Sequence, residues 1–169
     1  MKTTILFAVL LASLSTTEAE IGMGVLMIWP TARSTALAGA MTGLADEADA
    51  ACYNPAGLAF QTTAKAGFTY ANWLPDLYPG MHYASAAGGG PLCLPFLRGR
   101  KAFVAGSLVG ITLGRMNIYD GGGQISGRVN PWRGAAGVDA AVTLSDNMSV
   151  GLGAKLLASR DAIPPWQCL

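Results

Sequence analysis

Few side chains in this sequence have the types and spacings that chemistry requires. Asp46, Glu47 and Asp49 place three acids within four positions, which would suit paired-carboxylate chemistry. Nothing in the sequence marks a substrate beside them, and such a cluster is usually solvated or ion-paired. Serine hydrolase chemistry would depend on the only histidine, His82, and residues 105–109 lack both glycines of a nucleophile elbow. The sequence therefore predicts no catalytic residues.

The cysteines and the glycine run do not indicate a cofactor or metal site. Cys52, Cys93 and Cys168 are far apart, form no CxxC motif and have no histidine near them, whereas a zinc site needs four closely spaced ligands. We expect them to behave as small hydrophobic residues. Gly121–Gly123 lacks the lysine and the strand-to-helix context of a phosphate loop. The prediction is a protein that is not an enzyme and has no metal or cofactor.

The composition is that of a chain that meets something other than water. Hydrophobic residues make up 51% and charged residues 12%, against about 25% charged residues in an ordinary soluble domain. A membrane-spanning helix needs about 20 consecutive apolar residues, and no such run follows position 20. Barrel strands need only ~9–11 residues with alternating faces. These features favour a membrane β-barrel over the alternative, a soluble glycine-rich β-protein. The scattered Lys and Arg residues, with a net charge of +1, indicate no nucleic-acid partner.

The N-terminal residues have the layout of a secretory signal peptide. Lys2 provides a positive charge, residues 5–14 are apolar apart from one serine, and Thr17 and Ala19 are small residues suited to cleavage after Ala19. We predict a signal peptide at 1–19, and hence export, with the outer membrane as the destination of a barrel protein.

Residues 20–63 are expected to form a helical or irregular segment. The stretch 34–51 is rich in alanine and compatible with a helix, with Ser34 as a candidate N-cap. Asn54 and Pro55 should end any helix, and Gly57 should turn the chain.

From residue 64 the pattern changes to a period of two, and we predict about five strands of a partial antiparallel barrel within 64–160. Five strands cannot close a membrane barrel, so the sequence predicts either a fragment or an assembly of several chains. Residues 161–169 contain two prolines and are expected to be an irregular tail. The predicted strands are 65–73, 81–87, 102–114, 134–145 and 148–159, with loops at 91–101 and 115–130 and a tight turn at Asp146–Asn147.

Two motifs resemble the FadL-like outer-membrane proteins, especially the PorV/PorQ family. The first is the segment 30–40 with Leu44–Ala48, followed by Tyr53-Asn54-Pro55-Ala56-Gly57-Leu58-Ala59. The second, more specific to the PorV/PorQ branch, is Ala71-Asn72-Trp73-Leu74-Pro75-Asp76-Leu77. The hairpin 142–151 is also similar, and the resemblance extends over roughly 22–160. It implies a fourteen-stranded barrel whose N-terminal segment is a plug in the lumen.

The resemblance implies a role in type IX secretion, with membrane lipid and with secreted cargo or other secretion components as partners. FadL-like transport of hydrophobic molecules is an alternative, and a non-functional fragment or structural exported β-protein is another. The plug motif either gates transport or only folds the plug. Tyr70 and Trp73 lie either in an aromatic belt or in plain wall packing. Residues expected in the plug are Arg33, Asp46, Glu47, Asn54, Pro55 and Gly57, and those in the first-strand motif are Asn72, Trp73, Leu74, Pro75 and Asp76.

Overall fold

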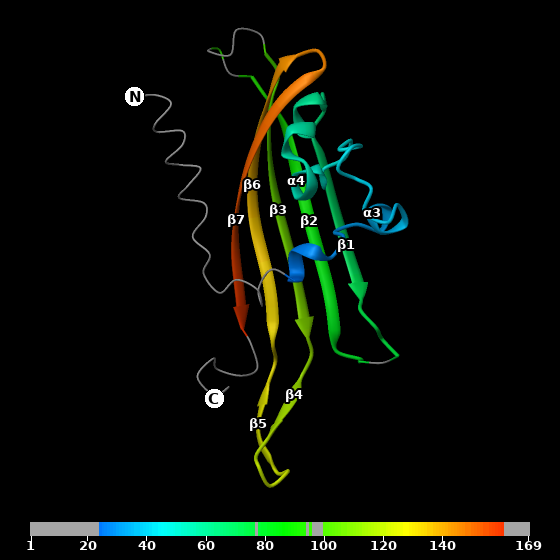
Figure 1. Ribbon diagram of the computed structural model, residues 1–169, viewed down its shortest axis with the longest axis vertical. Coiled ribbons are helices and arrows are strands. Elements are labelled where there is room, and N and C mark those ends of the chain that lie inside the picture. The colour runs from blue at the N-terminus through cyan, green and yellow to red at the C-terminus, as the bar shows by residue number, and fades with distance from the viewer. Residues whose placement is uncertain (1–23, 77, 94, 96–99, 161–169) are drawn as a thin grey trace, which may run out of the picture.

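The structure, a computed structural model, describes residues 24–76, 78–93, 95 and 100–160, and the chain is mainly β with short helices. One antiparallel sheet has the strand order β1-β2-β3-β6-β7 (Figure 1). It is open, since β1 and β7 do not pair within the part of the chain that is described. Its strands are β1 (Lys65–Asn72), β2 (Met81–Leu92), β3 (Ala102–Leu113), β6 (Trp132–Ser145) and β7 (Met148–Arg160).

A second, two-stranded sheet continues the hairpin between β3 and β6. Its strands β4 (Met116–Tyr119) and β5 (Ile125–Val129) pair with each other and extend beyond one end of the main sheet (Figure 1). The Asp120 carboxylate accepts backbone hydrogen bonds from Gly122 and Gln124, both at 2.9 Å, which stabilises the turn at its tip. The prediction of a loop over 115–130 was therefore wrong, because this short-range side-chain bonding makes the glycine run a hairpin turn.

The short helical elements cover one face of the main sheet. The 3₁₀ helices are η1 (Gly24–Met27) and η2 (Pro55–Phe60), and the α-helices are α3 (Ala32–Ala36) and α4 (Ala50–Tyr53). A core forms where α4 and η2 meet β3 and β6, with Leu58 and Phe103 almost fully buried. A second core forms where Val25 of η1 packs with Tyr83 and Ile111. Each such large side chain stabilises the fold by roughly 1.5–3 kcal/mol on burial.

The other strand predictions are close to the observed elements. The five strands of the main sheet are confirmed, and Asp146–Asn147 forms the tight turn between β6 and β7. The loop predicted over 91–101 was wrong at its start, because β2 continues to Leu92. Pro91 pairs in register with Phe103 there, near the end of the strand, where a missing N–H donor costs little.

The stretch 34–51, which its composition makes compatible with a helix, is not one continuous helix. Helix α3 ends at Ala36 and is capped by Thr31, while Ser34 is the third residue of its first turn. Two alanines that follow, Ala38 and Ala45, have positive φ values of 49° and 42°, so the chain bends repeatedly along the sheet. Packing on the sheet overrides the helical propensity of the alanines.

Two of the predicted segments lie outside the described residues: the signal peptide at 1–19 and the tail at 161–169, which includes Cys168. Within the described ranges, no helix is both long and apolar enough to cross a membrane.

Candidate functional site: a plug-like segment on one face of the sheet

Residues 24–63, which we call the plug segment, lie against one face of the main sheet, and the other face is open. Alternation along β6 shows the division: Asp139 and Ala141 are buried under the plug segment, whereas Val138 points away from it and is exposed. We call these the covered face and the exposed face. Elements η2, α4 and η1 all contact β6 or β3.

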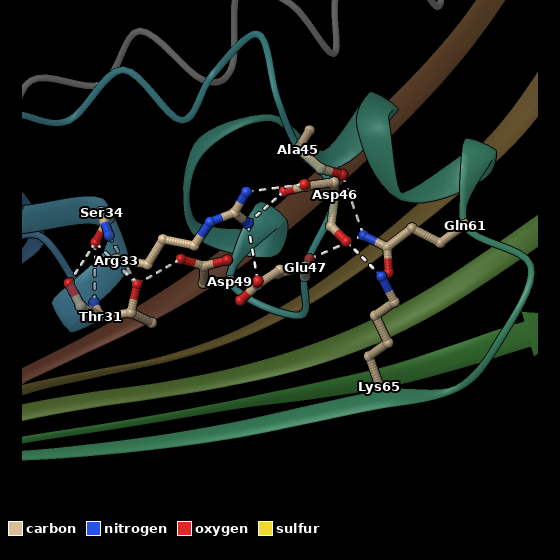
Figure 2. A network of polar contacts seen from close by, with 9 residues as sticks. All are labelled: Thr31, Arg33, Ser34, Ala45, Asp46, Glu47, Asp49, Gln61 and Lys65. Carbon is tan, nitrogen blue, oxygen red and sulfur yellow. Dashed lines mark hydrogen bonds and ion pairs between the residues drawn. The ribbon is translucent and has the colours of Figure 1, made fainter. Parts of the chain in front are cut away.

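An ion-paired network connects α3 to the acidic loop within the plug segment (Figure 2). Arg33 of α3 forms two parallel hydrogen bonds with the Asp46 carboxylate, at 2.7 and 3.0 Å, and a third with Glu47 at 2.8 Å. Hydrogen bonding to Arg33 lowers the pKa of the Asp46 carboxyl, and the same bond raises the pKa of Arg33. All three side chains are substantially exposed, so the network orders the loop more than it stabilises the fold.

Asp49 has a different role from the other two acids. Its Oδ2 accepts a hydrogen bond from Thr31 Oγ1 at 2.9 Å, and its Oδ1 is buried without a partner among the described residues. Burial raises the pKa of this carboxyl, with the hydrogen bond from Thr31 opposing the shift. Thr31 and Ser34 form a capping box at the start of α3, so Asp49 connects this cap to the chain before α4.

The Asn54–Gly57 motif turns the chain between α4 and η2. The Asn54 side chain donates to the Thr42 carbonyl at 2.9 Å, and Pro55 is the first residue of η2. Gly57 lies against Ala45 so closely that an added Cβ would be 2.1 Å from the Ala45 Cβ. A glycine is therefore required at position 57 by close packing.

Residues of β7 contact this turn, and the sequence analysis did not identify them as site residues. Ser149 Oγ donates to the Ala56 carbonyl at 2.8 Å, and an added Cβ on Gly151 would lie 2.3 Å from the Ala56 nitrogen. An added Cβ on Gly153 would lie 2.0 Å from Asp139 Oδ1 and 3.6 Å from Pro55 Cγ. The small side chains on this face of the hairpin were visible in the sequence, but only docking of the plug segment shows what they accommodate.

Two further contacts were not predicted: one lies within the plug segment, and the other joins it to the sheet. Gln61 Nε2 donates to the carbonyls of Ala45 and Glu47, at 3.1 and 2.8 Å, and Lys65 Nζ donates to the Asp46 carbonyl (Figure 2). Lys65 is the first residue of β1, so the acidic loop is bound directly to the edge of the sheet.

A buried polar cluster lies between α4 and the sheet. Asp139 on β6 is 2% exposed and has no hydrogen-bond partner among the described residues. Lys155 on β7 donates to the Cys52 carbonyl at 3.3 Å. Burial raises the pKa of the Cys52 thiol, which favours its protonated form. The covered face thus carries charge. In the described part of the chain, no group of three or more His, Cys, Asp or Glu side chains is arranged to hold a metal ion.

The second motif forms the turn after β1. Asn72 ends the strand, Leu74 has a positive φ of 51°, and Pro75 and Asp76 are exposed in the turn. The Trp73 ring is tilted against Tyr83 on the covered side, with centroids 6.0 Å apart. Trp73 therefore packs on the covered side of the sheet and does not lie on the exposed face.

A cavity of about 470 Å³ lies between the plug segment and strands β1 and β2. Its lining includes the charged residues Glu47, Asp49 and Lys65 and the hydroxyls of Thr31 and Ser85, together with small apolar side chains. The Ser85 hydroxyl donates to the Pro30 carbonyl at its edge. Such a lining suits water or polar groups better than a hydrophobic solute.

Comparison with protein-family models, with curated proteins and with solved structures found no significant match to this chain.

Proposed function

We propose that this chain forms part of the wall of an outer-membrane β-barrel, with the plug segment inside it, and that it serves protein export in the manner of the PorV/PorQ family. The observation that carries the proposal is the division of charge between the two faces of the sheet. Among the residues that the structure describes, the exposed face has no charged side chain between its two ends, whereas the covered face has Lys65, Asp139 and Lys155.

An apolar face of this size favours lipid over water. Large apolar side chains on it are highly exposed, and contiguous apolar patches beyond a few hundred Å² are rare on soluble monomers. In hydrocarbon the same side chains are in their preferred solvent, while the polar plug segment is confined to the lumen. Among the most exposed of them are Phe68, Val138, Met148, Leu152 and Leu156.

The proposal requires partners for the edge strands β1 and β7. Each unpaired backbone amide in hydrocarbon would cost several kcal/mol, so further strands must pair with both edges in the membrane. These strands complete the wall, whether they come from one chain or from several.

The export role is favoured over transport of hydrophobic molecules by the cavity beside the plug segment. A carrier of hydrophobic molecules needs an apolar cavity in its lumen, and this one is lined by Glu47, Asp49 and Lys65. The ion-paired and hydrogen-bonded plug segment supports a lumen that is closed to such solutes.

The test is expression of the full chain in a bacterium that has type IX secretion, followed by fractionation and binding. We expect the protein in the outer-membrane fraction, resistant to extraction with alkaline carbonate. In detergent it should bind the C-terminal signal domain of a secreted cargo and should not bind the same cargo without that domain. Binding of oleate without cargo binding would instead support transport, and a protein that stays soluble without detergent would contradict the membrane proposal.

A further inference from the structure

One row of side chains crosses the exposed face at the end of the sheet that adjoins β4 and β5. The strand register places Asn72 opposite His82, His82 opposite Thr112, Thr112 opposite Trp132, and Trp132 opposite Arg160. Each lies an even number of positions from the outward side chains of its own strand, so all five point away from the plug segment. We call these five residues the boundary row.

The boundary row differs in chemistry from the rest of the exposed face. Trp132 is 41% exposed and Arg160 is also exposed. His82 Nδ1 is 2.8 Å from the Tyr70 hydroxyl, and the two rings stack with centroids 5.9 Å apart. Tryptophan, tyrosine and histidine combine an apolar body with a polar end, and arginine pairs with phosphate. The row therefore suits a layer that is apolar on one side and carries phosphate groups on the other.

Beyond the boundary row the exposed face is apolar until the opposite end of the sheet. On β6 the outward positions from Gly134 to Leu144 extend for about 33 Å at ~3.3 Å per residue. With a strand tilt of about 40°, this is ~25 Å along the membrane normal, the usual height of the apolar band of a membrane barrel. The turn Asp146–Asn147 and the exposed Lys101 mark the far end.

We propose that the boundary row lies at the interface of a phospholipid bilayer, with lipid phosphates against Arg160 and His82 and with the β4–β5 hairpin in water beyond it. This inference rests on the proposed membrane function and adds the depth and orientation of the wall. The occupant is a phospholipid layer because the row combines a cation with aromatic rings at one edge of an uncharged band. The exposed polar turn around Asp120 fits an aqueous position for the hairpin.

The experiment measures the depth of two tryptophans on the same strand. The full chain is refolded into phosphatidylcholine vesicles as a Trp29→Phe, Trp73→Phe, Trp166→Phe variant, which leaves Trp132 alone. A matched variant adds Trp132→Phe and Val138→Trp, which moves the probe about 15 Å deeper by the strand rise and tilt above. Phosphatidylcholines brominated at shallow or deep acyl positions then quench each probe. If the two tryptophan replacements in the plug segment and turn prevent folding, the same depths are measured with spin labels on Trp132→Cys and Val138→Cys in a Cys52→Ser, Cys93→Ser, Cys168→Ser background.

We expect the probe at 132 to be quenched most by shallow bromines and the probe at 138 most by deep ones. Equal quenching at both positions, or deepest quenching at 132, would overturn the boundary row while leaving the membrane function in place. A chain that enters no vesicle, with protease-sensitive strands and no quenching by any lipid, would overturn the proposed function together with this inference.

The contribution of charge is tested with Arg160→Glu, and Arg128→Glu on β5 serves as the matched control beyond the row. In vesicles containing anionic phosphatidylglycerol, Arg160→Glu should weaken association by about fivefold or more at low salt, as expected for one basic residue near an anionic surface. The control should have a smaller effect. Equal effects of the two changes would place Arg160 away from the phosphate layer.

Discussion

Val138 and Asp139 are neighbours in the sequence and lie on opposite faces of β6, with opposite surroundings. The apolar Val138 is 65% exposed, while the charged Asp139 is 2% exposed beneath the plug segment. A soluble sheet with one open face shows the reverse arrangement, with apolar residues inside and charged residues outside. On β6, therefore, a charged residue lies beneath the plug segment and an apolar residue lies on the open face, and the following predictions test each side of this contrast.

The largest effect is expected for a charge on the exposed face. In the proposed membrane placement, Val138→Lys puts an ammonium group near the middle of the apolar band, which should destabilise the protein in vesicles by about 2–4 kcal/mol. The measurement is urea unfolding in phosphatidylcholine vesicles. The control is Ile125→Lys, at an exposed apolar residue of β5 outside the band, which should change the free energy of unfolding little. If both variants lost the same free energy of unfolding, the proposed difference in surroundings between the exposed face and the β4–β5 hairpin would be contradicted.

The second prediction concerns the docking of the plug segment on the covered face. Gly151→Ala adds a Cβ that would lie 2.3 Å from the Ala56 nitrogen, so backbone must move, and we expect a loss of about 1–3 kcal/mol. Residues 37–49 should also become sensitive to protease. The control is Gly67→Ala on the same face of β1, where an added Cβ meets nothing within 4 Å. Resistance to protease in Gly151→Ala would show that η2 does not depend on this close approach.

A smaller effect of opposite sign is expected at Asp49. The pKa of Asp49 is higher in the folded protein than in the unfolded chain, so ionisation of Asp49 destabilises the folded state. This loss of stability begins as the pH rises above the pKa of the unfolded chain and is complete above the pKa of the folded protein. Asp49→Asn keeps an oxygen for the Thr31 hydroxyl and removes the charge, so at neutral pH it should stabilise by less than about 1 kcal/mol. The gain should vanish at acidic pH in unfolding titrations. A variant that is less stable at every pH would contradict the burial of an ionised carboxylate.

The smallest effect is expected for the exposed ion pairs of Arg33. The pKa of Asp46 is lowered in the folded protein, so its contribution is present above the unfolded pKa and is lost as the pH falls through the folded one. Arg33→Gln should therefore be slightly less stable than the wild type at neutral pH and equal to it in strong acid. High salt should also reduce the difference. A loss that persists at low pH would mean that Arg33 acts through packing instead of charge.

Much of the sheet could be predicted because its information is local. The alternation of apolar and small or polar residues along 102–114, 134–145 and 148–159 specifies both the strands and their faces, and Asp146–Asn147 specifies the turn. The exposed apolar face follows from the same pattern. Arg33, Asp46 and Glu47 could be assigned to one plug motif from the sequence, although the sequence did not say which of them would pair.

The plug segment was predicted less well because its path depends on contacts between distant residues. An alanine-rich stretch favours a helix, but Met41 and Ala45 gain burial only if the chain bends along the sheet with Ala38 and Ala45 at positive φ. The need for glycine at 151 arises from a turn almost a hundred positions earlier in the chain.

The sequence by itself determined the β-structure, its two chemically different faces and the turn residues, since each follows from spacing along one strand. Only the tertiary structure decided which face receives the plug segment, which of the acids pair with Arg33, and which residues form the boundary row. A row across five strands is set by hydrogen-bond register, which brings Asn72 and Arg160 into one line although they are far apart in the chain.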